Sequence, residues 1–210
     1  RDKGMSEIIL EDNEFYVESG TRCSKLARYV AKHGFKDSAF LAGIPGTIGG
    51  ALSMNAGCYG FEIWDFVSKV LLVDLDGNEV VRDKTEFNIG YRKALNKNVQ
   101  IEYFLGVWLN FPKGEITSAQ KVIEDLLQHR KQTQPIEWPS AGSTFRNPVN
   151  NYAAKLIEEC DLKGFTIGGA QISKKHANFI INLGDASASD IEKLINFVKK
   201  VLSSKISIII

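Results

Sequence analysis

The sequence is poor in the residues that define several large classes of protein. It has three cysteines, at positions 23, 58 and 160, which lie far apart and include no C-x-x-C pair. This pattern argues against a disulfide framework and a zinc site, and it fits a reducing compartment. No apolar run approaches the roughly 18 residues of a membrane helix, and the first residues are no signal peptide. We therefore expect a cytoplasmic protein without a metal or a membrane partner.

An excess of charge of either sign is also missing. The chain has 26 lysines and arginines against 25 aspartates and glutamates, for a formal net charge of +1. Such a balance creates no global field that would attract nucleic acid, so any bound anion must be held by a local site. With 210 residues, 44% of them hydrophobic, the chain can bury a core and form one or two domains.

Both ends of the sequence look interrupted. The chain begins with Arg1 rather than methionine and ends in the apolar run KISIII. An exposed β-branched run of this kind promotes aggregation. We therefore expect the sequence to be part of a longer polypeptide, or to need a partner segment over its terminal strands.

Hydrophobic periodicity predicts an α+β fold in two parts. The first part is mainly strands, with a hairpin centred on Asp76-Gly77 and one helix that ends at Gly34. The second part mixes helices and strands, and Ser189 with Glu192 forms a capping-box pattern at its last helix. The predicted strands are 6–10, 15–19, 68–81, 98–111, 165–173 and 177–184, and the predicted helices are 21–34, 118–131, 151–164 and 187–202. The turn-rich segment 111–115 places the domain boundary between 112 and 113.

A glycine-rich stretch, GIPGTIGG, occupies residues 43–50. Its spacing would let consecutive N–H groups turn towards one anion such as a diphosphate, while a flat apolar ring packs against Ile44, Pro45 and Ile48. The stretch is neither a Walker loop nor G-x-G-x-x-G. On composition alone, a glycine-rich turn between strands is an equally good interpretation.

Two further motifs carry candidate chemistry. Ser143 lies among turn formers in AGSTF, where it is either a turn cap or a nucleophile paired with His176. Arg92 follows Tyr91 in the loop before a long strand. It is either solvated surface or a bidentate partner for a carboxylate. His176 is either a surface residue or a ligand contact.

Five motifs together resemble one family. They are GIPGTIGGALSMNAGCYG, GYRKA, PSAGSTFRNP, LIEECDLKGFTIGGAQISKKHANFIIN and ASASDIEKL. They occur in the order found in UDP-N-acetylenolpyruvoylglucosamine reductases, the MurB flavoenzymes of bacterial cell-wall synthesis, in their shorter variety. The resemblance runs over nearly the whole chain. It implies an FAD-binding domain of the vanillyl-alcohol-oxidase (PCMH) type in residues 1–112, incomplete at its N-terminus, followed by a smaller mixed α/β substrate-binding domain in 113–210.

The resemblance also implies the chemistry and the site. The family uses FAD and NADPH to reduce an enolpyruvyl ether of a UDP-sugar to a lactyl ether, and we expect a monomer in the bacterial cytoplasm. Arg92 would stabilise the negative charge of the intermediate, and Ser143 would be its proton donor. The FAD contacts would be Gly43, Ile44, Pro45, Gly46, Thr47, Ile48, Gly49, Gly50, Asn55, Ala56 and Gly57. The substrate contacts would be Tyr59, Tyr91, Asn147, Lys163 and His176.

Two departures from the family pattern keep other interpretations open. The glycine-rich segment that precedes RDKGM in the family is missing, and so is a glutamate in the strand after the last helix. A non-catalytic remnant that binds the UDP-sugar through residues 113–210 is one alternative. A related flavin oxidoreductase with another substrate is the other, and the joint match of Ser143, Arg92 and Lys163 weakens it.

Overall fold

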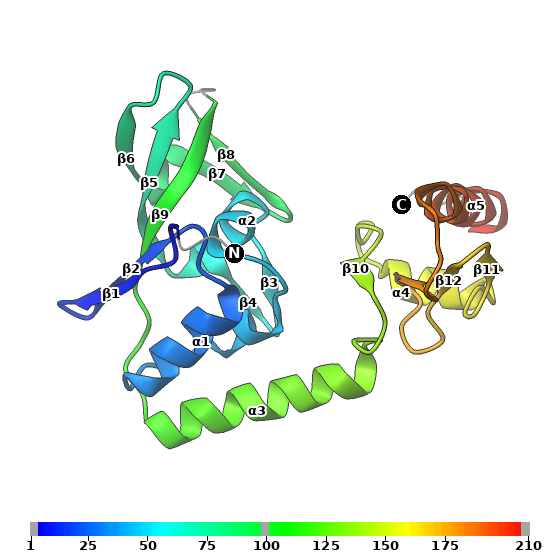
Figure 1. Cartoon of the computed structure of the whole chain (residues 1–210), viewed down its shortest axis with the longest axis horizontal. Coiled ribbons are helices and arrows are strands. Elements are labelled where there is room, and N and C mark those ends of the chain that lie inside the picture. The colour runs from blue at the N-terminus through cyan, green and yellow to red at the C-terminus, as the bar shows by residue number, and fades with distance from the viewer. Residues whose placement is uncertain (1–3, 98–100, 207–210) are drawn as a thin grey trace. The chain divides into compact units, whose positions relative to one another are not determined.

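The computed structural model describes residues 4–97 and 101–206, with side chains to Ser204. These residues form two compact units, unit 1 within residues 1–128 and unit 2 within 129–210 (Figure 1). Parts of two predicted segments lie outside the described residues: Val99 of the predicted strand 98–111, and residues 207–210 of the apolar C-terminal run.

Unit 1 is built on an antiparallel sheet with the strand order β1-β2-β9-β5-β6. Its strands are β1 (Ile8–Glu11), β2 (Glu14–Glu18), β9 (Glu102–Leu109), β5 (Val67–Asp74) and β6 (Glu79–Asp83). In β9 the residues alternate regularly only after a bulge, because the register with β5 shifts between the pairs Leu71–Gly106 and Leu72–Phe104. The shift exposes Tyr103 and turns Phe104 towards Trp64 of the core.

Helices cover one side of this sheet and two small hairpins extend from it (Figure 1). The predicted helix at 21–34 is confirmed as α1, which buries Leu26 and Val30 and is followed by Gly34 at a φ of 80°. This helix comprises Cys23–Lys32. The remaining elements of unit 1 are η1 (Ala39–Gly43), α2 (Ile48–Ser53), η2 (Ile63–Asp65), η3 (Lys84–Glu86), β3 (Gly57–Cys58), β4 (Phe61–Glu62), β7 (Phe87–Gly90) and β8 (Lys93–Asn96). The indole N–H of buried Trp64 donates to the carbonyl of Leu52 at 2.8 Å and so ties η2 to α2.

Helix α3 (Ile116–Thr133) follows β9 and spans the division between the units. Its residues Ala119 and Ile123 belong to the buried core of unit 1. Because the first part of the helix packs there, the compact units divide at 128/129, inside α3, whereas the sequence places the domain boundary at 112/113.

Unit 2 has its own antiparallel sheet and its own core. The strand order is β10-β13-β12-β11, and the elements are β10 (Ser140–Ser143), α4 (Ala153–Glu159), β11 (Thr166–Ile167), β12 (Ala170–Ile172), β13 (Phe179–Asn182) and α5 (Ala188–Ile206). Leu156 of α4 and Leu194 and Val198 of α5 are buried in its core. None of the helices in the described part of the chain combines the length and apolarity needed to cross a bilayer.

The start of α5 corrects one sequence-based expectation. The predicted capping box of Ser189 with Glu192 is wrong, because the helix begins at Ala188. Ser187 N instead donates to Asp190 Oδ2 at 3.0 Å, and Asp190 N donates to Ser187 Oγ at 3.1 Å. The preceding loop is closed by the side chain of Asn182, whose oxygen accepts from the amide of Ala186, so the chain reaches the helix earlier.

Candidate functional site

The glycine-rich stretch 43–50 runs from the end of η1 through a short loop into α2. Pro45, Gly46, Thr47 and Gly50 are exposed, and Gly46 has a φ of 136°, a backbone conformation that side chains disfavour. Ile48 is fully buried in the core of unit 1. Its side chain therefore cannot pack against a ligand ring, and that expectation is wrong.

At least three amides of this stretch are already used within the protein. The amide of Ile44 donates to the carbonyl of Leu41 at 3.2 Å, that of Ile48 to the carbonyl of Thr21 and that of Gly49 to the carbonyl of Ser19, the last two at 2.8 Å. An N–H group has one hydrogen to give, so these three do not turn towards an anion in this structure. A Cβ on Gly49 would lie 3.0 Å from Cβ of Ser19. This glycine is thus explained by the close approach of β2 rather than by a ligand.

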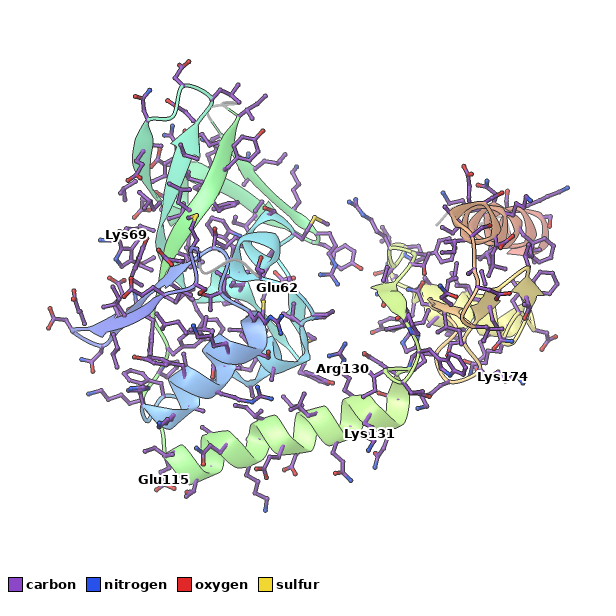
Figure 2. All side chains as sticks on the ribbon, in the orientation of Figure 1. Glu62, Lys69, Glu115, Arg130, Lys131 and Lys174 are labelled. Atoms are coloured by element: carbon purple, nitrogen blue, oxygen red, sulfur yellow. The ribbon has the colours of Figure 1, made fainter. Side chains whose placement is uncertain are left out.

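Asn55 is the residue around which the predicted sites of unit 1 converge. It follows α2, has a φ of 40° and is 1% exposed. Its amide nitrogen donates to Glu62 Oε2 at 2.5 Å and to the carbonyl of Gly90 at 3.2 Å, and Glu62 is labelled in Figure 2. Its side-chain oxygen is buried and has no hydrogen-bond partner among the described residues. Ala56, also predicted to contact FAD, is 7% exposed.

Tyr59 lies at the tip of the β3–β4 hairpin. Tyr59 and Gly60 form its two-residue turn with φ angles of 56° and 87°, as a type I′ turn requires. An aromatic residue in this conformation is strained, and such outliers concentrate at functional sites. The 39% exposed ring of Tyr59 borders a cavity of about 300 Å³ whose walls include Phe40, Phe61 and Val122.

Tyr91 and Arg92 form the turn of the second hairpin, between β7 and β8. Arg92 has a φ of 55°, its side chain is half-buried, and its guanidinium carbon lies 5.7 Å from the centre of the Tyr91 ring. Tyr91 itself is 54% exposed. Because Gly90 immediately precedes this turn, the hydrogen bond from Asn55 connects the glycine-rich segment to the predicted catalytic arginine.

An ion-pair cluster braces the other end of the same hairpin. Arg82 of β6 binds Glu102 of β9 through Nε at 2.8 Å and Nη2 at 2.5 Å, and it reaches Glu86 of η3 at 3.0 Å. Asn96 of β8 donates to Glu102 at 2.6 Å. The hydrogen bonds from Arg82 lower the pKa of Glu102. Sequence reasoning missed this cluster, since nothing in the spacing indicates that these residues meet.

Ser143 ends strand β10 in unit 2. The ladder with β13 shifts register between Ser140 and Ser143, and Gly142 has a φ of 82°. This bulge re-aims the strand end. The exposed Ser143 borders a cavity of about 390 Å³ whose wall includes Ile180, Ile191 and Ile195. The wall of this cavity also contains the polar residues Ser140, Thr144 and Asn182.

Lys163 lies close enough to His176 for its positive charge to act on the imidazole ring. Burial lowers the pKa of His176, and the positive charge of Lys163 lowers it further. His176 Nδ1 accepts a hydrogen bond from the amide of Asn178 at 3.2 Å. The described hydrogen bonds include none between Ser143 and His176, so a Ser–His nucleophilic pair is not formed. Lys163 Nζ pairs with Glu158 at 2.5 Å.

Asn147 caps helix α4. Its side-chain oxygen accepts from the amide of Ala153 at 3.1 Å, while the side-chain oxygen of Asn151 accepts from the amide of Tyr152 at 2.9 Å. The exposed Asn147 thus holds a helix start. Within the described residues no group of His, Cys, Asp and Glu has the arrangement of a metal site.

Comparisons with known proteins identify both units. Residues 134–210 match the family profile "UDP-N-acetylenolpyruvoylglucosamine reductase, C-terminal domain", and residues 2–82 match the profile "FAD binding domain". The architecture is thus an FAD-binding domain followed by a smaller mixed α/β domain, as the resemblance implies.

Relatives cover both units in single proteins. The reductase of this name from Nitrosomonas eutropha is 44% identical over 214 residues, which cover 97% of this chain and 64% of the relative. That from Methylococcus capsulatus is 47% identical over 184 residues, covering 88% of this chain and 60% of the relative. The chain therefore spans somewhat under two thirds of the length of these relatives.

A solved structure supports the same assignment. The crystal structure of UDP-N-acetylenolpyruvylglucosamine reductase (MurB) from Thermus caldophilus has a TM-score of 0.80 and 34% identity, covering 88% of this chain and 68% of that one. The chain belongs to the UDP-N-acetylenolpyruvoylglucosamine reductase family.

Proposed function

We propose that this chain is part of an enzyme that reduces UDP-N-acetylglucosamine enolpyruvate to UDP-N-acetylmuramate, a step of peptidoglycan precursor synthesis. FAD is its cofactor, NADPH its reductant and the bacterial cytoplasm its location, and the enzyme is a monomer. Membership of the family and the match of residues 2–82 to an FAD binding domain support the proposal.

The residues of unit 1 fit FAD in a specific way. Pro45, Gly46, Thr47 and Gly50 present exposed backbone without bulky side chains. The buried oxygen of Asn55 has no donor within the described residues, and a bound group with an N–H would supply one. Gly43, Ile44, Gly49, Ala56 and Gly57 would shape the site, and Ile48 would support it from the core. Bound FAD would supply the hydride, which comes from NADPH.

Arg92 has the role of an electrostatic clamp. Hydride addition to the terminal carbon of the enolpyruvyl group leaves negative charge on the adjacent carbon and its carboxylate. A guanidinium offers two parallel N–H donors to a carboxylate and stays charged throughout. The left-handed backbone of the turn sets the position of the Arg92 backbone, and the Tyr91 ring lies beside its guanidinium group. Charge that develops in the transition state therefore meets a donor already in place.

Ser143 has the role of the proton donor. The adjacent carbon, once it carries the charge, needs one proton to complete the conversion of the C=C bond to a C–C single bond. Such a carbanion is a strong base, so a hydroxyl without a neighbouring base suffices. This agrees with the absence of a described hydrogen bond from His176 to Ser143.

Five further residues would hold the UDP-sugar: Tyr59, Tyr91, Asn147, Lys163 and His176. The ammonium group of Lys163 is the natural partner of the diphosphate. Its present partner, Glu158, has a side chain that is 58% exposed, so exchange of that pair for a phosphate is inexpensive.

The observation that carries the proposal is the hydrogen bond from Asn55 to Gly90. It joins a segment suited to FAD with the turn that holds Arg92, through the buried side chain of Asn55. The expected consequence is a flavoprotein in which oxidised flavin is bleached by NADPH and restored by the enolpyruvyl substrate.

The test compares Ser143→Ala with Ser204→Ala, whose hydroxyl binds only a helix carbonyl. Stopped-flow absorbance should show normal bleaching in both variants. Reoxidation by the enolpyruvyl substrate should slow by about 10²- to 10⁴-fold in Ser143→Ala alone. If Ser143→Ala is reoxidised at the wild-type rate, Ser143 is not the proton donor. If the purified protein is colourless but binds the UDP-sugar, it is a binding protein and not the enzyme.

A further inference from the structure

The backbone that follows Ser143 loses its strand partner where the sheet ends. The paired register of β10 with β13 stops at Ser143 opposite Phe179. The next amide, of Thr144, still donates to the carbonyl of Asn178 at 2.8 Å. Phe145 lies beyond the ladder, yet it is 7% exposed, so its backbone groups need partners inside the protein.

The side chain of Asn178 supplies both of these partners. Its oxygen accepts from the amide of Phe145 at 2.9 Å, and its nitrogen donates to the carbonyl of Phe145 at 2.9 Å. A side-chain amide carries one acceptor and one donor group, as a peptide does, so Asn178 extends the ladder by one residue. At 4% exposure it does this almost without water.

Ser143 is thereby fixed from both directions. On its N-terminal side the bulge with left-handed Gly142 sets the direction of the strand. On its C-terminal side Thr144 and Phe145 are held by the backbone and the side chain of Asn178. The serine hydroxyl itself has no described partner that would orient it, so its placement depends on this backbone.

We propose that Asn178 is a positioning residue for Ser143, which it holds through a side-chain amide that pairs with the backbone of Phe145. The inference rests on the proposed function of Ser143 as proton donor. Asn178 touches no reacting atom in this role. A displacement of about 1 Å of a reacting group costs about 100-fold in rate, which sets the scale of the expected effect.

Asn178→Asp provides a discriminating variant, because it keeps the shape and reverses one hydrogen bond. When ionised, the introduced carboxylate faces the carbonyl oxygen of Phe145 with an oxygen instead of an N–H. When protonated, its O–H restores that bond. Burial raises the pKa of a carboxyl group, so the reversal occurs in an accessible pH range. The titratable neighbour is His176, whose Nδ1 accepts from the amide of residue 178, and beyond it the charges of Lys163 and Glu158, which pair with each other, act on His176 with opposite sign.

The control is Asn151→Asp in the same unit. The side-chain oxygen of Asn151 accepts from the amide of Tyr152, and a carboxylate can do the same. Both variants replace a side-chain amide with a carboxyl group, and both are compared with wild type between about pH 5 and 8. Wild type and Asn151→Asp therefore report the pH dependence of the rest of the protein, without a carboxyl group at position 178.

The expected result has two parts. In Asn178→Asp, reoxidation of reduced flavin by the enolpyruvyl substrate slows about 10- to 100-fold at pH 8 and recovers as the pH falls, while bleaching by NADPH is unchanged. Asn151→Asp follows wild type. In Asn178→Ala, residue-resolved hydrogen exchange shows faster exchange of the Phe145 amide, because the acceptor oxygen is removed. Asn178→Leu, which fills more of the buried space and also lacks an acceptor, is used if the alanine variant does not fold.

The exchange measurement keeps this inference separate from the proposed function. If wild type shows no flavin turnover, the proposed function fails, and exchange of the Phe145 amide alone decides whether Asn178 holds the segment. A Phe145 amide as protected in Asn178→Ala or Asn178→Leu as in wild type overturns the inference. So does reoxidation in Asn178→Asp that equals wild type at every pH.

Discussion

Single glycines within one short segment are required for opposite physical reasons. Gly49 leaves little room for a side chain, because a Cβ would lie 3.0 Å from Cβ of Ser19, which would have to shift. Gly46 has open space around it, with no atom within 4 Å of a built Cβ, but its φ of 136° disfavours any side chain. Gly49 therefore maintains the packing of α2 on β2, whereas Gly46 keeps exposed backbone accessible.

We expect Gly46→Ala to weaken FAD binding more than it weakens the fold. The strain of its backbone conformation costs about 1 kcal/mol, and the added methyl group occupies exposed surface at the proposed flavin site. Gly77→Ala is the matched control, since Gly77 also has a positive φ, 86°, and no atom within 4 Å of a built Cβ. Urea unfolding should show similar losses in both variants, and FAD titration should show a loss in Gly46→Ala only. Equal FAD affinities would place the flavin elsewhere.

His176 should make the protein less stable in mildly acidic solution. Burial lowers its pKa from the usual 6.5, so as the pH falls the unfolded chain binds a proton more readily than the folded one. The stability that neutral His176 contributes is thus present above about pH 6.5 and decreases below it. His176→Gln should flatten the urea midpoint between pH 7.5 and 5, and the exposed His33→Gln should not. An unchanged slope in His176→Gln would contradict this assignment.

At the scale of elements, the β7–β8 hairpin is held at its base by charge. The side chains of Arg82 and Glu102 are only 13% and 4% exposed. Arg82→Met would leave the Glu102 carboxylate nearly buried without its cation, which should cost about 3 kcal/mol. Lys155→Met, which breaks a pair with 64% and 50% exposed side chains, should cost less than about 1 kcal/mol. Both values come from urea unfolding.

The pH dependence of the Arg82→Met deficit provides a second check. Arg82 lowers the pKa of Glu102 from 4.5, so this pair stabilises the fold above that pH and its contribution is lost as the pH falls through the lowered value. The difference between wild type and Arg82→Met should therefore narrow in acid. A deficit that is constant down to pH 3 would mean that lost packing, and not charge, causes it.

Sequence patterns predicted elements better than the contacts between them. The helix at 21–34 follows directly from its apolar spacing, whereas the bulge in β9 depends on its neighbour β5 and leaves no local signal. Ser189 with Glu192 and Ser187 with Asp190 are both plausible helix-start patterns in the sequence. The helix begins at the earlier one, after a loop that the side chain of Asn182 closes.

Of the candidate site, the sequence predicts only the residues whose side chains are themselves charged, reactive or part of a recognisable motif. The motifs predict Arg92 in a loop and Ser143 among turn formers. Arg92 does lie in a hairpin turn, whereas Ser143 ends strand β10, which the sequence patterns do not predict. Asn55 was expected as a flavin contact, but its link to Gly90 was not expected. Asn178 was missed altogether. An asparagine that pairs with backbone 35 or 33 residues away has no signature in a single sequence.

At the scale of the whole molecule, the described residues form two separate hydrophobic cores. Leu26 of unit 1 and Leu194 of unit 2 are both 0% exposed. Leu26→Ala and Leu194→Ala should each cost about 3–5 kcal/mol, and each should lower a different transition in calorimetry. Excess FAD should raise only the transition that Leu26→Ala lowers. A single transition shifted equally by both variants would show that the cores unfold together.

The residues of the segment 43–50 have different structural roles, and this limits how the segment can be re-engineered. Ile48 and Gly49 are committed to the interior and to a neighbouring strand, so a mutant library that varies them would mostly return misfolded proteins. Pro45, Thr47 and Gly50 are exposed and can be diversified with little risk to the scaffold. An attempt to retune cofactor preference should therefore concentrate its variation on these three positions.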